Sequence, residues 1–170
     1  MPAASWFGNY AAKLFAIDVD GARALFDILS LLASEAPYEG SDNLSPRDED
    51  DWTRAAWNSA TGDLAAAIMN DPILTGLVPG GGLPQQWKAR VESLLKLRGD
   101  NGRFVLVRLA QNLSWLFNCD ETWSERTILS SLEKEDSDRK AFLAGFFMNP
   151  RVVGEKLFAR LKPTLLGLAG

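Results

Sequence analysis

Histidine is absent from this chain of 170 residues, and cysteine occurs once. Without histidine the chain can form no Ser-His or Cys-His nucleophile pair and no histidine-ligated zinc site. It also lacks the side chain that most often acts as a general base near neutral pH. Because Cys119 is the only cysteine, no disulfide forms within the chain and no multi-cysteine metal site exists. Its neighbours Leu116 and Phe117 are apolar, which predicts a buried thiol rather than a reactive one.

The sequence also lacks a long apolar run and an excess of positive charge. The apolar stretch around 104–109 is far shorter than the ~20 residues of a membrane-spanning helix, so we expect a cytoplasmic protein without a membrane partner. A net charge of -4 argues against nucleic-acid binding through bulk positive potential. Two local basic groups stay as alternatives: Arg98, Arg103 and Arg108, and Arg151, Arg160 and Lys162.

What the chain does contain is apolar residues at helical spacing along almost its whole length. No run shows sustained strand alternation bounded by hairpin turns. The length suits one domain of ordinary size. The pattern therefore predicts a single all-α domain over 1–170, with roughly seven to nine helices of ordinary length and with loops at 37–47 and 71–84.

Two helical architectures fit this pattern. Helix pairs stacked in the α-solenoid manner are one, and a compact orthogonal bundle is the other. The chain ends on the apolar run 165–170 without the polar outer cap of an autonomous solenoid, so we expect a fragment of a larger protein. The glycines at 80–82 are expected to form a loop, because they lack the Gly-Lys-Ser or Gly-Lys-Thr ending of a phosphate-binding loop.

A cluster of poor helix formers, Asn58–Gly62, interrupts an Ala-rich helical pattern. Such a cluster marks either a turn or a place where small residues let another backbone approach closely. The six tryptophans of the chain divide into two groups by their position in the pattern. Trp52, Trp87, Trp115 and Trp123 fall on apolar faces and are expected in the core, whereas Trp6 and Trp57 are undetermined.

Local signals add two further expectations. In the segment that follows Asp20, helical spacing predicts an inward side made of Leu25, Phe26, Ile28, Leu29 and Leu32. Thr122 and Glu125 have the spacing of a capping box, which predicts a helix that starts at Thr122.

Three stretches together resemble a bacterial family. Residues 55–65, Ala-Ala-Trp-Asn-Ser-Ala-Thr-Gly-Asp-Leu-Ala, are similar to its Asn-Ser-Pro-x-Gly-x-Leu-Ala signature. Residues 104–123 are similar to an apolar helix that closes in Asp-x-x-Trp, and 140–166 are similar to its last two helices. The family is the helical domain of unknown function in the C-terminal part of large bacterial proteins, many with a sirtuin-like NADase domain and a role in antiphage defence. The resemblance covers roughly residues 50 to 168.

The resemblance implies packing positions rather than catalytic, cofactor-binding or metal-binding residues. These positions are Trp57, Asn58, Ser59, Gly62, Leu64, Asp120, Trp123 and Gly145. The family tends to have proline where this chain has Ala60, and this departure favours a continuous or mildly bent helix through Asn58–Gly62. The small residues there would let a neighbouring helix pack closely.

From these features we expect a non-enzymatic helical scaffold, sensor or protein-interaction module, without cofactor, in the C-terminal region of a multidomain bacterial defence protein. It would bind a protein partner or neighbouring domains of its own chain. The first alternative is a carboxylate-dependent enzyme domain that uses Asp48–Asp51 or Asp63. The second is a nucleic-acid-binding helical module built on the basic groups named above.

Overall fold

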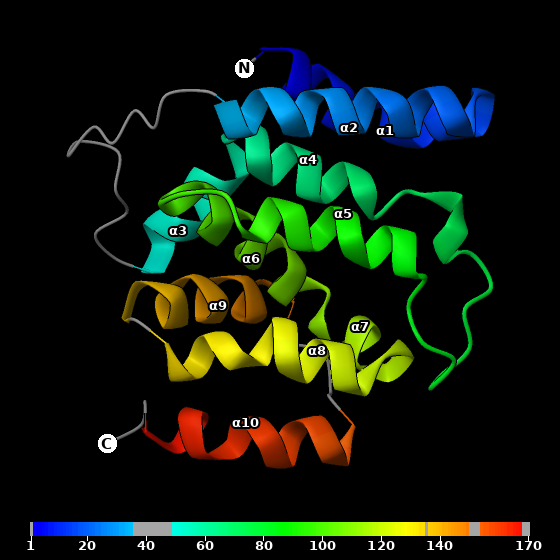
Figure 1. Ribbon diagram of the computed structural model, residues 1–170. Helices are drawn as coiled ribbons and strands as arrows, with labels where there is room; N and C mark the ends of the chain where they lie inside the picture. The colour runs from blue at the N-terminus through cyan, green and yellow to red at the C-terminus, as the bar shows by residue number, and fades with distance from the viewer. Residues whose placement is uncertain (1, 36–48, 135, 150–153, 168–170) are drawn as a thin grey trace.

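The computed structural model describes residues 2–35, 49–134, 136–149 and 154–167, and the side chains of 49–51 are not among the described parts. The described residues form helices and no strands, which confirms the all-α class (Figure 1). The elements are α1 (Pro2–Ile17), α2 (Val19–Glu35), α3 (Glu49–Trp57), α4 (Ala60–Ile68), η1 (Pro72–Leu74), α5 (Gln85–Leu95), α6 (Asp100–Gln111), α7 (Leu113–Cys119), α8 (Glu121–Thr127), η2 (Leu129–Glu133), α9 (Asp136–Met148) and α10 (Glu155–Gly167).

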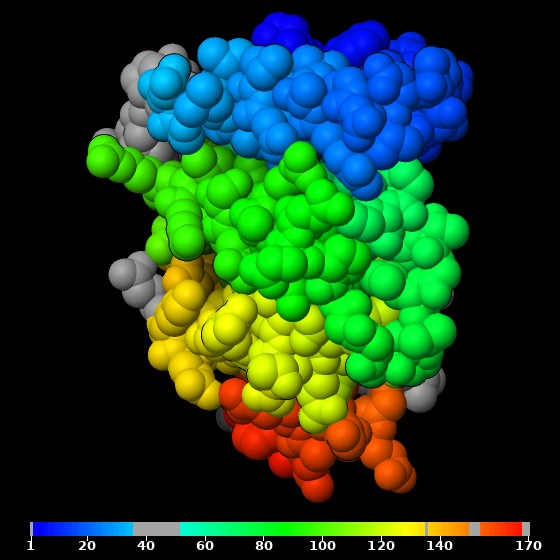
Figure 2. Space-filling model, turned by 45° about the vertical axis from the view of Figure 1, so that its right-hand side comes forward, coloured from blue at the N-terminus to red at the C-terminus, as the bar shows by residue number. Residues whose placement is uncertain are grey.

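The helices stack in two columns between which the chain alternates (Figure 1). In the first column α1 packs on α4, α4 on α6, and α6 on α9. The second column contains α2, α5, α8 and α10, which all run in the same direction across the view. The layers follow chain order from α1 and α2 at one end to α10 at the other (Figures 1 and 2). The architecture is therefore one of stacked helix pairs, the first of the two expected arrangements.

Close backbone contact joins α6 and α9 in the first column. The two helices run parallel, because Arg103 bonds Asp138 near their starts and Gly145 faces Val107 further along. A Cβ added to Gly145 would lie 2.8 Å from the carbonyl carbon of Val107 and 2.9 Å from its Cα. Only glycine allows this approach, so Gly145 sets the spacing of the two helices.

Ion pairs join the helices of the second column. Asp27 of α2 pairs with Arg90 of α5 at 2.8 Å. Two pairs then link α8 to α10 in parallel register, Glu121 with Lys156 at 2.9 Å and Glu125 with Arg160 at 3.4 Å. The four α8 and α10 side chains are partly or largely exposed, so these two pairs orient α10 more than they stabilise the fold.

One ion pair near the top of the stack is different, because its carboxylate is buried. The guanidinium of Arg23 binds both carboxylate oxygens of Asp71, at 3.0 and 2.8 Å. The side chain of Asp71 is 1% exposed, and it also accepts the backbone N–H of Ile73 to cap η1. Two charge-assisted bonds and a cap thus satisfy a carboxylate that burial alone would disfavour.

Two predicted continuous helices are each split in the structure. The apolar segment that starts at Phe104 breaks at Asn112 into α6 and α7, and the Ala-rich segment breaks between α3 and α4. These breaks bring the described residues to ten α-helices, above the predicted seven to nine. The side chain of Asn112 bonds the Arg108 carbonyl at 3.0 Å, which ends α6 by occupying one of its last acceptors.

The predicted loop at 37–47 lies outside the described residues. The predicted loop at 71–84 is irregular apart from the single turn η1. Gly80 and Gly82 have φ angles of 71° and 82°, the left-handed region that glycine adopts at no steric cost. Their N–H groups donate to carbonyl oxygens at the end of α7 at 2.8 and 2.9 Å, so this loop is fixed to the helix rather than open to a ligand.

Candidate interaction surfaces

The Asn58–Gly62 cluster forms a corner between two helices. The prediction of a continuous or mildly bent helix is wrong, because α3 ends at Trp57 and α4 begins at Ala60. Ser59 adopts an extended conformation at φ -102° and ψ 145°. Its hydroxyl accepts the N–H of Gly62 at 2.9 Å, so Ser59 is the N-cap of α4 and no proline is needed to break the helix.

The same corner explains why its residues are small. The Ser59 hydroxyl also donates to the Ala56 carbonyl at 3.0 Å, and the Asn58 amide donates to the Arg54 carbonyl at 2.8 Å. A Cβ on Gly62 would lie 2.8 Å from the carbonyl carbon of Ala56. The backbone that approaches Gly62 is thus the end of the preceding helix, and not a separate neighbouring helix as the sequence suggested.

Trp57 and Arg108 form an aromatic-cation pair beside this corner. The indole of Trp57 is half exposed, and the Arg108 guanidinium lies 4.4 Å from the ring centroid. The Arg108 Nε is buried without a hydrogen-bond partner among the described residues. Desolvation lowers the pKa of Arg108, and the negative charge of Asp63 partly opposes this shift. Leu64, next to Asp63, is fully buried in the core.

Asp120 fixes the junction of the Gly80–Gly82 loop, α5 and α8. One carboxylate oxygen caps α8 by accepting the Trp123 N–H, and the other accepts the Leu83 N–H and the Lys88 ammonium, each at 3.1 Å. Burial by itself raises the pKa of Asp120, but these three hydrogen bonds outweigh it and the pKa is lowered. Asp120 therefore holds three segments together as a charged group.

Trp123 continues this junction into the core. It is buried, its ring meets Trp87 edge to face, and its Nε1–H donates to the Glu92 carboxylate at 2.8 Å. The predicted capping box at Thr122 is wrong, since the cap is Asp120 and the Thr122 side chain is exposed. Asp120, two residues earlier, accepts the Trp123 N–H and places a full negative charge at the helix N-terminus, so α8 begins at Glu121.

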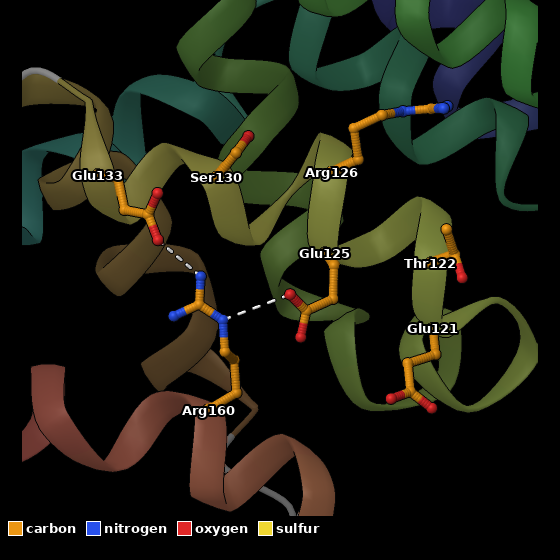
Figure 3. Close-up of a pocket in the computed structure, with 7 residues that line it drawn as sticks. All are labelled: Glu121, Thr122, Glu125, Arg126, Ser130, Glu133 and Arg160. Atoms are coloured by element: carbon orange, nitrogen blue, oxygen red, sulfur yellow. Dashed lines mark hydrogen bonds and ion pairs between the residues drawn. The ribbon is translucent and has the colours of Figure 1, made fainter.

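An open groove of about 550 Å³ lies between α8, η2 and α10 (Figure 3). Arg160 extends into it from α10 and pairs with Glu133 at 2.7 Å and with Glu125 at 3.4 Å. These pairs, with Glu133 first, raise the pKa of Arg160. The central cation of the groove thus already has two carboxylate partners, which join α10 to α8 and η2. The lining residues are Glu121, Thr122, Glu125, Arg126, Ser130, Glu133 and Arg160.

The carboxylates considered for catalysis do not meet in the described structure. Asp63 lies with its Cβ near Gly8 of α1, and the side chains of Asp48–Asp51 lie outside the described residues. Within the described part of the chain, no three His, Cys, Asp or Glu side chains are grouped so that they could hold a metal ion. Cys119 is buried as predicted, and desolvation together with the charge of Asp120 raises the pKa of its thiol.

Two of the basic residues considered for nucleic acid have carboxylate partners in the described part of the chain. Arg103 bonds Asp100 and Asp138, and Arg160 bonds two glutamates as described above. Arg98 and Lys162 are exposed, while Arg151 lies outside the described residues. As far as the structure describes these residues, neither group keeps all of its cations free for a phosphate backbone.

The apolar residues of the α1–α2 pair exceed what the core absorbs. Trp6, Tyr10 and Ile17 follow one stripe of α1 at i, i+4 and i+11 and are all exposed. On α2 the predicted inward side is partly correct. Phe26 and Leu29 are buried and Leu25 packs partly buried against the core, whereas Ile28 and Leu32 are exposed. The exposed large apolar residues of this pair, which we call the α1–α2 surface, are Trp6, Tyr10, Ile17, Ile28, Leu31 and Leu32.

The two helices that carry the α1–α2 surface form the N-terminal layer of the stack, shown in blue in Figure 2. Among the exposed side chains of α1, only Lys13 is charged. Helical periodicity does not predict this surface, because it assigns to the core the apolar residues that flank the buried stripe of a helix. α1 and α2 contain more apolar residues than a single buried stripe of a helix can hold, and this excess is the signal that could have revealed the α1–α2 surface.

Five of the six tryptophans agree with their expected positions or were left undetermined. Trp52, Trp87 and Trp123 are buried as predicted, and Trp6 and Trp57 are half exposed. Trp115 is 38% exposed, so its predicted place in the core is wrong. Because the helix breaks at Asn112 and α7 begins at Leu113, the helical register that predicted an inward Trp115 does not continue to that residue.

Comparison with known proteins finds no match, since no family model, no curated protein and no solved structure is similar to this chain. No helix in the described ranges combines the length and the apolar character that crossing a membrane requires.

Proposed function

We propose that the chain is a non-catalytic helical scaffold that binds a protein partner or a neighbouring domain through the α1–α2 surface. The observation that supports this function is the exposure of Trp6, Tyr10 and Ile17 on one stripe of α1. Monomeric proteins seldom leave contiguous apolar side chains in water, and tryptophan and tyrosine are enriched where binding energy concentrates.

The resemblance of 55–65 and 104–123 to the helical domain of bacterial defence proteins supports a place in such a protein. In that setting the stack connects an effector domain to a recognition partner in the cytoplasm and carries no chemistry of its own. The carboxylate-enzyme and nucleic-acid alternatives receive no comparable support. Asp63 belongs to no group of three or more His, Cys, Asp or Glu side chains among the described residues, and Arg103 and Arg160 are paired.

Affinity capture from the source cells tests this proposal. The wild-type chain is compared with a Trp6→Ser/Ile17→Ser variant, and Phe158→Ser is the matched control because Phe158 is half exposed on α10 at the other end of the stack. We expect the double variant to lose the captured proteins and the control to keep them. Equal capture by all three chains, with melting temperatures unchanged, would sink the proposal.

A further inference from the structure

Arg108, which packs on Trp57, differs from the other arginines of the helix stack. Its guanidinium makes no described ion pair or side-chain hydrogen bond, and it lies over an exposed indole instead. The other buried or part-buried arginines have carboxylate partners. These pairs are Arg23 with Asp71, Arg90 with Asp27, Arg103 with Asp138, and Arg160 with Glu133.

Such a cation costs stability unless something compensates for it. Desolvation lowers the pKa of Arg108, and a buried Nε–H without an acceptor forgoes a hydrogen bond that water would supply. Asp63 is close enough to act through its charge, but it makes no described ion pair with Arg108. Buried polar groups are ordinarily hydrogen-bonded, so an arginine kept under these conditions calls for an explanation.

We propose that Trp57 and Arg108 form a docking site for a protein segment that presents a carboxylate side chain next to an apolar one. The carboxylate pairs with the terminal guanidinium nitrogens of Arg108, whose side chain is still partly exposed, and the apolar group covers the exposed indole of Trp57. The inference rests on the proposed function, since it supplies a second surface to a protein-binding module.

Charge decides which anion fits. Arg108 with Asp63 beside it is a poor site for a polyanion, whose further charges would meet Asp63 and a chain of net charge -4. One carboxylate, in contrast, neutralises Arg108 without excess negative charge. The site therefore favours an acidic peptide over a nucleic-acid backbone.

Fluorine NMR of the fluorotryptophan-labelled chain tests the site, because the Trp57 signal among six indoles is identified by its loss in Trp57→Phe. The probes are acetyl-Leu-Glu-Leu-amide, the same peptide with glutamine, and a short single-stranded oligonucleotide. We expect the glutamate peptide to shift the Trp57 signal saturably and the glutamine peptide to bind about tenfold more weakly. Arg108→Met abolishes the difference, whereas the matched variant Arg98→Met preserves it.

The melting temperature of Arg108→Met distinguishes a binding role of Arg108 from a structural one. If Arg108 is kept for binding, Arg108→Met melts at or above the wild-type temperature, and a clearly lower melting temperature overturns the inference. So does equal binding of both peptides, or an Arg108-dependent response to the oligonucleotide alone. Loss of the Trp57 response with intact capture through the α1–α2 surface refutes only this inference. An intact response without capture refutes the proposed function instead.

Discussion

Gly145→Ala tests whether α6 and α9 are held together by backbone contact. The added Cβ meets the carbonyl carbon of Val107 at 2.8 Å and its Cα at 2.9 Å, and it lies closer still to the carbonyl oxygen. Carbon atoms prefer a separation of about 3.5–4.0 Å, so the two helices must move apart by about 1 Å. All three obstructing atoms belong to the backbone, so no side-chain rotation relieves the contact.

The expected loss follows from two opposing effects. Overpacking a well-packed interface costs about 1–3 kcal/mol, and a site obstructed by backbone lies at the upper end of that range. Alanine recovers about 1 kcal/mol of helix propensity over glycine. The net loss is therefore about 2 kcal/mol, which for a chain of this size lowers the melting temperature by about 4–8 °C.

Thermal and urea unfolding followed by circular dichroism measure this loss. Gly167→Ala on α10 is the matched control, because no atom lies within 4 Å of its added Cβ, and we expect its stability to be unchanged or slightly raised. A double variant Gly145→Ala/Val107→Ala should show no rescue, since the obstruction is not the valine side chain. If Gly145→Ala melts together with Gly167→Ala, the close approach of α6 and α9 is wrong.

Three further predictions concern buried polar groups and the helix corner. Arg23→Met leaves the buried Asp71 carboxylate without its cation and should lower the free energy of unfolding in urea by about 3–5 kcal/mol. Adding Asp71→Asn to this variant should recover part of the loss. A loss below about 1 kcal/mol would contradict a stabilising role of the Arg23–Asp71 pair. Folding lowers the pKa of Asp120, so the ionised carboxylate stabilises the folded state above about pH 4, and this stabilisation disappears as the pH falls through the pKa of the folded state. Asp120→Asn should therefore flatten the pH dependence of unfolding in that acid range, and an unchanged slope would show that its bonds do not persist in solution. Gly62→Leu should lower the melting temperature by several degrees, because its Cβ meets the Ala56 carbonyl, and wild-type melting would place Gly62 in solvent.

Local pattern predicted the helices well, since apolar spacing and polar breaks are encoded within a few residues. It failed at Ser59, where the absence of proline suggested continuity, because a serine hydroxyl can cap a helix as effectively as proline can interrupt one. It also failed at Thr122, since Asp120, two residues earlier, already caps the helix through the Trp123 N–H. Both errors arise from alternatives that differ by one or two hydrogen bonds.

The surfaces were harder to predict than the core. Periodicity places Ile28 with Phe26 on one broad apolar side, and only the packing of α1 and α2 on the stack decides that Phe26 is buried and Ile28 is not. The pairing of Trp57 with Arg108 joins residues from α3 and α6, and no local signal links them. Contacts between distant segments depend on the stacking itself, which the sequence pattern left open between two architectures.

Covalent footprinting of the chain inside its source cells tests the central claim most directly, because it reports which side chains a partner covers. Trp6, Tyr10 and Ile17 should be labelled severalfold less in the cell than in the isolated chain, whereas Phe158 on α10 should be labelled equally in both. Equal labelling of Trp6 and Ile17 in the two settings would mean that the α1–α2 surface is exposed to water in the cell, and this would contradict its proposed role in binding.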